Sequence, residues 1–185
     1  MKKERKPSTA VVPCPAVLLS VGEGPDANII TLSWVANVNS IPPSIAAGVR
    51  PERHSYHLLK ETEDFVVNIP TEDQLRATII CGTKSGRNIN KWQECNFTPM
   101  PSAKILSPMI AECPINIECK TKQVVELGSH HLFIGEVLTV HIDEEMIDEN
   151  GRLDLAAAKL FTFNPVAGGE YWTLGKKLDT KDFRN

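Results

Sequence analysis

Alternating apolar and polar positions predict an extended segment early in the chain. Ile30, Leu32 and Trp34 alternate with polar or smaller residues, which is the period of two expected of a strand with one apolar face. A second apolar run, 44–49, follows a proline turn. The pair is typical of two core strands in a β domain. Hydroxyls at the strand tip and a glycine at Gly48 also suit a cradle for a flat, anionic ligand.

Further extended stretches occur throughout the chain. In the first, Pro13 and Pro15 each remove a backbone donor, so we expect an edge strand or a bulge there. The turn at residues 22–26 then predicts an antiparallel hairpin into the strand that contains Ile30. The predicted strands cover residues 9–21, 29–35, 44–49, 65–69, 115–125, 131–142, 161–164 and 171–174.

Two or three helices are inserted between these strands. Ser55 is the predicted N-cap of the first helix, and Thr71 with Gln74 matches a capping box that opens the second. We expect the second helix to end at Gly82 in a left-handed C-cap, and Asn88 to cap a short third helix. Residues 153–160 form a short apolar or helical stretch. Many strands with few helices, and no G-x-G-x-x-G fingerprint, predict a mainly β fold, a closed antiparallel barrel rather than a Rossmann sheet.

Length and charge restrict the classes of function. At 185 residues we expect one domain over 1–185, with a short polar arm at 1–8. The formal net charge is −3 and the charges are interspersed, which argues against a nucleic-acid partner. The basic start lacks the apolar region of a signal peptide, and no apolar run approaches the roughly 18 residues of a membrane helix. We therefore expect a soluble, cytoplasmic protein with no membrane partner.

The cysteines and histidines predict neither a disulfide framework nor a metal site. The five cysteines are odd in number and include no C-x-x-C pair, so reduced thiols are expected. His54 and His57 are spaced to share a helix face, but without a third ligand nearby we interpret them as a surface feature. The sequence also lacks the G-x-S-x-G and H-E-x-x-H motifs of hydrolases.

Residues 81–88, with the sequence C-G-T-K-S-G-R-N, are a candidate anion-binding loop. Two glycines, two hydroxyls, a lysine and an arginine within eight residues can form a nest of backbone N–H groups with cations beside it. The order of residues is not that of a Walker loop. A polar surface loop between helices is the alternative interpretation.

Seven short motifs, in this order and spacing, resemble the flavin reductase-like family, and specifically its flavoredoxin-like branch of small FMN-binding proteins. The resemblance extends from Val11 to about Leu174. The motifs are T-L-S-W-V at 31–35, N-S-I-P-P-S-I-A-A-G-V at 39–49, F-V-V-N-I-P at 65–70, C-G-T-K-S-G-R-N-I-N-K-W at 81–92, E-C-P at 112–114, G-S-H-H-L-F-I-G-E-V at 128–137 and Y-W-T-L-G at 171–175.

The resemblance implies a split β-barrel, antiparallel and Greek-key-like, that forms a homodimer with one FMN per subunit. It places the flavin ring on the segment around Ser33, Trp34, Val35 and Asn37. It places the ribityl chain and phosphate near Arg50, Arg53, Ser55, Ser85, Gly86 and Arg87, with Lys91 as a further phosphate ligand. His130 matches a histidine near the nicotinamide or the ring face. Other implied cofactor contacts are Thr31, Gly48, Tyr56 and Thr83.

Two functions follow from the resemblance. One is an enzyme, an NAD(P)H-dependent flavin oxidoreductase that passes hydride or electrons through FMN to a flavin or another acceptor. The other is an electron carrier, reduced by a redox protein such as ferredoxin and independent of NADH or NADPH. In both, the flavin N5 carries the chemistry and no catalytic side chain is implied. A role like that of pyridoxamine phosphate oxidases lacks support in these motifs.

Overall fold

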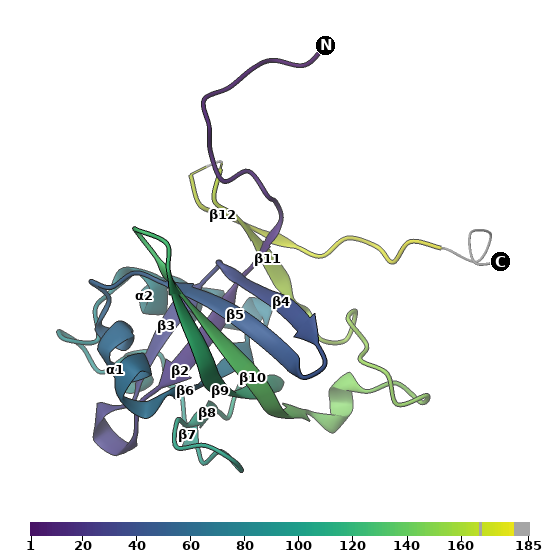
Figure 1. The fold of residues 1–185 in the computed structure, drawn as a ribbon. Helices are drawn as coiled ribbons and strands as arrows, with labels where there is room; N and C mark the ends of the chain where they lie inside the picture. Colours follow the sequence, from purple (N-terminus) through teal and green to yellow (C-terminus); the bar gives the residue numbers. More distant parts are fainter. Residues whose placement is uncertain (167, 180–185) are drawn as a thin grey trace.

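A seven-stranded antiparallel sheet forms the body of the computed structural model, which describes residues 1–166 and 168–179 (Figure 1). Along the sheet the order is β3-β2-β6-β9-β10-β5-β4. The strands span β3 Asn28–Leu32, β2 Val17–Val21, β6 Asp64–Ile69, β9 Ile115–Glu126, β10 His131–Ile142, β5 Pro43–Val49 and β4 Val35–Ser40. The mainly β class with inserted helices is therefore confirmed.

The two edge strands of this sheet, β3 and β4, are consecutive in the chain. Only Ser33 and Trp34 join them, and such a connection spans at most about 11 Å. The edges must therefore approach one another, yet β3 pairs only with β2 and β4 only with β5. The barrel is split at this connection, so the prediction of a closed barrel was wrong on that point, whereas the split barrel implied by the resemblance is confirmed.

Two apolar clusters stabilise the fold. The larger fills the barrel and includes Leu19, Phe65 and Phe133, each fully buried. The smaller lies between the barrel and the helices, where Ile29, on the opposite face of β3 from Ile30, meets Trp92. β3 is buried on both faces, and the polar side chain of Asn28 lies at its first position.

The helices lie on one side of the barrel (Figure 1). They are α1 His54–Thr62, α2 Leu75–Thr83 and α3 Lys91–Glu94, with short 3₁₀ turns at Gly24–Asp26, Glu72–Gln74 and Glu144–Met146. The capping box is confirmed, since the backbone N–H of Thr71 donates to Gln74 Oε1 at 3.0 Å. Three other cap predictions were wrong. Arg53 rather than Ser55 precedes α1, Lys84 rather than Gly82 follows α2, and Asn90 rather than Asn88 caps α3.

Short strands complete the structure. β1 Cys14–Pro15, β11 Phe161–Asn164 and β12 Glu170–Thr173 form a small sheet, and β7 Pro99–Met100 pairs with β8 Met109–Ile110. The stretch 153–160 contains turns and no α-helix. Residues 1–12 are exposed and extend away from the body (Figure 1). Among the described residues, no helix combines the length and apolar character needed to span a membrane.

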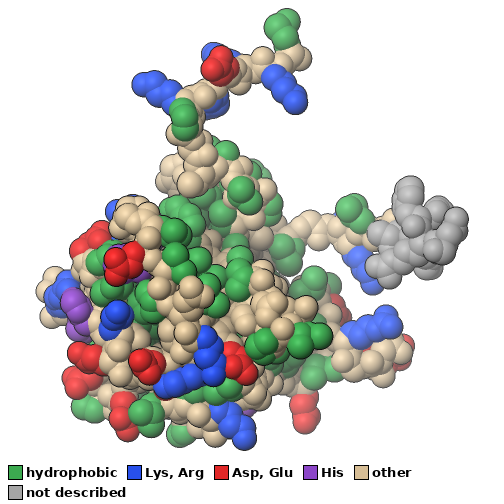
Figure 2. All heavy atoms as spheres, in the orientation of Figure 1, with side chains coloured by type: hydrophobic (Ala, Val, Ile, Leu, Met, Phe, Trp, Pro, Cys, Tyr) green, Lys and Arg blue, Asp and Glu red, His purple; other side chains and the backbone are tan. Residues whose placement is uncertain are grey.

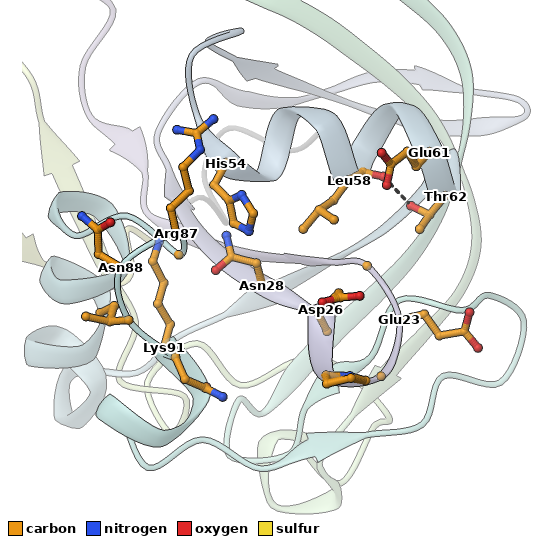
Figure 3. Close-up of a pocket in the computed structure, with 17 residues that line it drawn as sticks. Glu23, Asp26, Asn28, His54, Leu58, Glu61, Thr62, Arg87, Asn88 and Lys91 are labelled. Atoms are coloured by element: carbon orange, nitrogen blue, oxygen red, sulfur yellow. Dashed lines mark hydrogen bonds between the residues drawn. The ribbon is translucent and has the colours of Figure 1, made fainter.

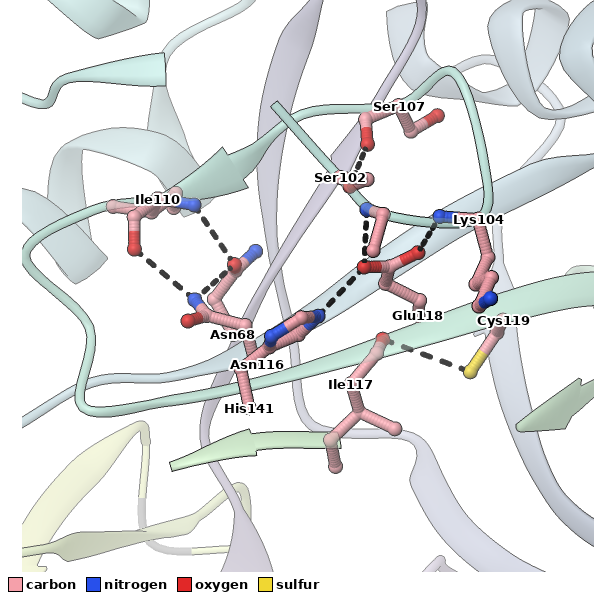
Figure 4. Close-up of polar contacts among 11 residues, drawn as sticks. Asn68, Ser102, Lys104, Ser107, Ile110, Asn116, Ile117, Glu118, Cys119 and His141 are labelled. Atoms are coloured by element: carbon pink, nitrogen blue, oxygen red, sulfur yellow. Dashed lines mark hydrogen bonds and ion pairs between the residues drawn. The ribbon is translucent and has the colours of Figure 1, made fainter. Parts of the chain in front are cut away.

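A buried carboxylate anchors the loop that follows β7 (Figure 4). Glu118 on β9 is fully buried and accepts hydrogen bonds from the backbone N–H groups of Ala103 and Lys104, both at 2.8 Å. His141 Nε2 on β10 lies 2.7 Å from the same carboxylate. Burial alone would raise the pKa of Glu118, but these three partners outweigh it and hold the pKa below its usual value.

Candidate functional site

A cationic pocket of about 150 Å³ lies between the start of α1 and the loop that joins α2 to α3. Four cationic side chains line it against one carboxylate, that of Glu52. The structure thereby brings together six residues for which the resemblance implied contacts to the flavin phosphate: Arg53, Ser55, Ser85, Gly86, Arg87 and Lys91. Residues more than 30 positions apart in sequence thus line one cationic pocket.

The loop 84–88 is held by its own polar groups and by the segment before α1. The backbone N–H of Arg87 donates to Ser85 Oγ at 3.3 Å, and the Arg87 guanidinium donates to the carbonyl oxygen of Glu52 at 3.1 Å. This last bond joins the two sides of the pocket. Because the Arg87 side chain is exposed and uses one of its five donors here, the others face solvent or a ligand.

Lys91 forms the buried wall of the pocket. Only 4% of its surface is exposed, and its ammonium donates to the carbonyl oxygens of Ile29 and Cys81, both at 2.7 Å. Burial lowers the pKa of Lys91 to about 8, because the charged form loses hydration. An ammonium has three donors, so these two hydrogen bonds leave one donor unused. Charge at this depth would act in a low effective dielectric.

Gly86 lets the loop approach the barrel. A Cβ at this position would overlap the side-chain oxygen of Asn28 and lie 2.8 Å from the His54 ring. Asn28 is itself buried and donates to Ser55 Oγ at 2.8 Å, which leaves the Ser55 hydroxyl free to donate elsewhere. Burial lowers the pKa of His54, and Arg87 and Lys91 lower it further, so this ring stays neutral near pH 7.

The cationic pocket continues into a wider groove of about 990 Å³ (Figure 3). Asn28, His54, Gly86, Arg87 and Lys91 line both spaces. Figure 3 shows the His54 and Asn28 side chains next to one another, with Arg87 beside them. The far side of the groove carries the carboxylates Glu23, Asp26 and Glu61. The groove is therefore polarised, with its cations at the loop and its acids along the 22–26 turn and α1.

A third space adjoins the split of the barrel. It measures about 210 Å³, and Thr31, Ser33 and Thr83 contribute to its wall. Gly82 lines both this space and the cationic pocket, so the two lie on either side of the end of α2. The aromatic residues Phe163 and Tyr171, from β11 and β12, close the opposite side.

Trp34 marks the outer face of the split. Its side chain is 46% exposed, and its ring centroid lies 4.8 Å from that of His130. The carbonyl oxygen of Trp34 accepts a hydrogen bond from the backbone N–H of Gly48 at 2.8 Å, where a Cβ would lie 3.1 Å from the Trp34 Cβ. Burial and the nearby Arg50 lower the pKa of His130, which keeps its ring neutral near pH 7.

Seven of the implied site residues line none of these three spaces: Trp34, Val35, Asn37, Gly48, Arg50, Tyr56 and His130. Val35 packs against the barrel core and Asn37 is exposed on β4. The Arg50 guanidinium lies 3.6 Å from the Glu52 carboxylate at the surface. The Tyr56 hydroxyl lies 2.8 Å from His131 Nδ1, and the ring packs on Phe133. In this chain, Tyr56 connects α1 to the barrel.

Asn28 and His54 are pocket residues that the sequence did not reveal as such. A polar residue at the start of a strand that is buried on both faces is the signal that could have identified Asn28. His54 is half buried against the loop, whereas His57 is exposed. No cluster of three or more potential metal-ligating side chains occurs in the part of the chain that the structure describes.

The fold and site define the class of the protein. An antiparallel barrel open at one connection, with a cationic pocket beside the opening, is a split β-barrel. The chain belongs to the flavin reductase like domain family, whose model matches residues 9–159. This membership confirms the resemblance.

Two solved structures and one relative illustrate the similarity. Flavoredoxin of Desulfovibrio vulgaris (Miyazaki F) has a TM-score of 0.91 and 30% identity over 98% of this chain and 97% of that one. Flavoredoxin from Methanosarcina acetivorans has a TM-score of 0.88 and 26% identity, covering 99% of this chain and 100% of that one. An uncharacterized protein of Pyrococcus abyssi is 33% identical over 90% of this chain and 93% of its own length.

Proposed function

We propose that the protein binds FMN across the end of α2 and transfers electrons or hydride through it. The observation that carries this proposal is the adjacency of the split of the barrel and the cationic pocket, which share Gly82. A flavin mononucleotide is planar at one end and doubly anionic at the other. In this proposal the space beside the split takes the planar ring, and the cationic pocket takes the phosphate.

The phosphate end is assigned to the cationic pocket. Arg53, Arg87 and Lys91 supply positive charge, and the Ser55 and Ser85 hydroxyls supply further donors. Gly86 allows the loop backbone to come close, because no side chain fits between it and Asn28. Ionised donors form shorter and stronger hydrogen bonds to phosphate than neutral ones do. We therefore assign most of the binding energy to this end.

The ring end is assigned to the connection 33–34 and the neighbouring Thr31 and Thr83. When bound, the flavin supplies the redox chemistry, accepting a hydride or electrons at its ring. The protein orients the ring and aims polar groups at its edge, where negative charge develops on reduction. The ring of Trp34, within this connection, lies beside that of His130 and is itself exposed.

Two donors are compatible with this site. A nicotinamide dinucleotide would make the protein an NAD(P)H-dependent flavin oxidoreductase, and the family to which the chain belongs supports this. A redox protein such as ferredoxin would make it an electron carrier, and the similarity to two flavoredoxins favours this second candidate. The exposed Trp34 edge suits contact with either donor.

Anaerobic titration and stopped-flow spectroscopy test both parts of the proposal. We expect FMN to bind one equivalent per chain, with saturable quenching of its fluorescence. Rapid bleaching of the flavin band by NADH or NADPH would identify an oxidoreductase. Bleaching by reduced ferredoxin, but by neither nucleotide, would identify a carrier. Protein that leaves FMN fluorescence unchanged would contradict the flavin proposal itself.

We also propose that the protein is a homodimer. Exposed apolar side chains lie on the edge strand β4, on the turn that follows it and on the second half of β10, and Figure 2 shows hydrophobic side chains gathered on this side of the molecule. The exposed members are Val38, Ile41, Leu138, Val140 and Ile142. Apolar patches and bare strand edges of this kind are normally covered by a partner.

Sedimentation equilibrium at micromolar concentration tests the dimer. We expect twice the 20.4 kDa chain mass for the wild type and a single chain mass for Val140→Asp, because a carboxylate there would be desolvated in the interface. Glu145→Asp, a conservative change in the exposed 144–146 turn, is the control. A monomeric wild type would contradict the dimer.

A further inference from the structure

Two thiols lie in contact at the base of the loop that forms the cationic pocket. Cys81 Sγ and Cys95 Sγ are 3.7 Å apart, although the residues are 14 positions apart in the chain. Cys81 belongs to the last turn of α2, and Cys95 follows α3 directly. A disulfide requires sulfur atoms about 2.05 Å apart, so the two must approach by roughly 1.7 Å. Rotation of the Cys95 side chain, at the end of a four-residue helix, can supply much of this movement.

The segment between these cysteines supplies six of the 13 residues that line the cationic pocket. Ser85, Gly86, Arg87 and Lys91 all lie in the segment between the two thiols. Lys91 is bonded to the backbone of both cysteines. Its ammonium donates to the carbonyl oxygen of Cys81 at 2.7 Å, and its own carbonyl oxygen accepts from the N–H of Cys95 at 3.1 Å. A bond between the two sulfurs would therefore close a ring around the loop and constrain Lys91 from both ends.

The other three cysteines have different surroundings. Cys113 is buried in the same apolar cluster as Cys81, but its thiol donates to Gln74 Oε1 at 3.5 Å. Cys119 lies in the barrel core. Cys14 is beside the N-terminal arm, with its thiol directed at the carbonyl oxygen of Val11 at 3.1 Å. Among the described residues, Cys81 and Cys95 are the pair whose sulfur atoms approach one another.

We propose that Cys81 and Cys95 are a modification site that forms an intramolecular disulfide and clasps the loop 84–90. The clasp encloses the phosphate end of the proposed flavin site, but it depends only on the two thiols and remains testable if the flavin proposal fails. Cys95 is half buried whereas Cys81 is fully buried, so a small oxidant reaches Cys95 first. Both residues are free thiols in the structure, which represents the reduced state.

The oxidant required is a small-molecule disulfide, such as oxidised glutathione. The Cys95 thiolate attacks one sulfur of the oxidant, forms a mixed disulfide and releases one glutathione thiolate. The Cys81 sulfur, after losing its proton, displaces the second glutathione from Cys95 and forms the internal bond. The two protons from the protein thiols end on the two glutathiones, and two electrons pass to the oxidant. Burial raises the pKa of both protein thiols, so the exchange is slow at neutral pH.

Peptide mapping of the full-length protein tests the clasp. The protein is equilibrated with an excess of oxidised glutathione, unfolded, alkylated and digested. We expect a single linked peptide pair containing Cys81 and Cys95, with the remaining three cysteines alkylated. Closing a ring of this size restricts the unfolded chain, so the midpoint of thermal unfolding should rise by about 6–10 °C relative to the reduced protein. Amide hydrogen exchange over 84–90 should slow in the oxidised form.

Two variants separate the clasp from general oxidation. Cys95→Ser should abolish both the linked peptide and the rise in unfolding temperature, whereas Cys119→Ser should retain both. The mapping of the wild-type protein is decisive even if a variant folds poorly. Glutathione trapped on Cys95 without an internal bond, a link between any other two cysteines, or five alkylated cysteines after equilibration would each overturn the proposal.

Discussion

Replacing Gly86 with alanine is expected to weaken FMN binding by about 100-fold, which corresponds to about 2.7 kcal/mol. The added Cβ would overlap the Asn28 side-chain oxygen and press on the His54 ring. Relief requires either the loop or Asn28 to move. Movement of Asn28 breaks its buried hydrogen bond to Ser55, and movement of the loop withdraws the Arg87 donors from the pocket. Fluorescence titration with FMN measures the loss.

The matched control is Gly175→Ala, where a Cβ would meet no atom within 4 Å. Its FMN affinity should equal that of the wild type. Arg87→Ala and Ser85→Ala, which remove donors without adding bulk, should each weaken binding by about 1–3 kcal/mol. If Gly86→Ala binds FMN normally while its circular dichroism spectrum is unchanged, the phosphate lies elsewhere.

Replacing Glu118 with alanine is expected to lower the free energy of unfolding by about 3–5 kcal/mol. The carboxylate is the shared acceptor for two backbone N–H groups and lies 2.7 Å from His141 (Figure 4). Its removal takes the acceptor away from the backbone N–H groups of Ala103 and Lys104 and leaves a cavity where the buried carboxylate was. Urea unfolding at neutral pH measures the change. Glu126→Ala, an exposed glutamate on the same strand, should shift stability by about 0.5 kcal/mol or less.

The lowered pKa of Glu118 predicts that the free energy of unfolding depends on pH. The pKa of Glu118 is held below its usual value of 4.5, so the folded state binds this proton more weakly than the unfolded state. Its contribution is therefore complete above about pH 4.5 and is lost as the pH falls through the folded-state pKa. The stability difference between the wild type and Glu118→Ala should shrink below this pH. A difference that stays constant down to the acid transition would contradict an ionised, hydrogen-bonded Glu118.

Local signals in the sequence predicted much of the β framework. The long strand predicted over 131–142 coincides with β10 at both ends, because its apolar character and its flanking turn are properties of adjacent residues. The Thr71 and Gln74 capping box was also predicted, since both of its hydrogen bonds join residues three apart. Caps that depend on where a helix meets the barrel, such as those of α1 and α2, were not predicted correctly.

Contacts between residues distant in sequence determined the surroundings of Trp34 and Lys91, which the hydrophobic pattern could not predict. The alternation of Ile30, Leu32 and Trp34 predicts three buried side chains, yet the strand ends at Leu32 and Trp34 is half exposed at the split. The family resemblance implied that Lys91 is a phosphate ligand. Its main partners are carbonyl oxygens, one of them 62 positions away on β3. No local window contains both members of such a pair.

The sequence by itself determined the strand periodicity and the cationic and hydroxyl composition of the loop 81–88, because each depends on residues within one short segment. It also determined the family resemblance, because that depends only on the order and spacing of motifs along the chain. Only the tertiary structure decided that the sheet stays open at Ser33 and Trp34, that Asn28 and His54 join the pocket, and that Cys81 meets Cys95. These contacts depend on how helices and strands distant in sequence pack against one another, since a side chain acquires its partners only when the chain has folded.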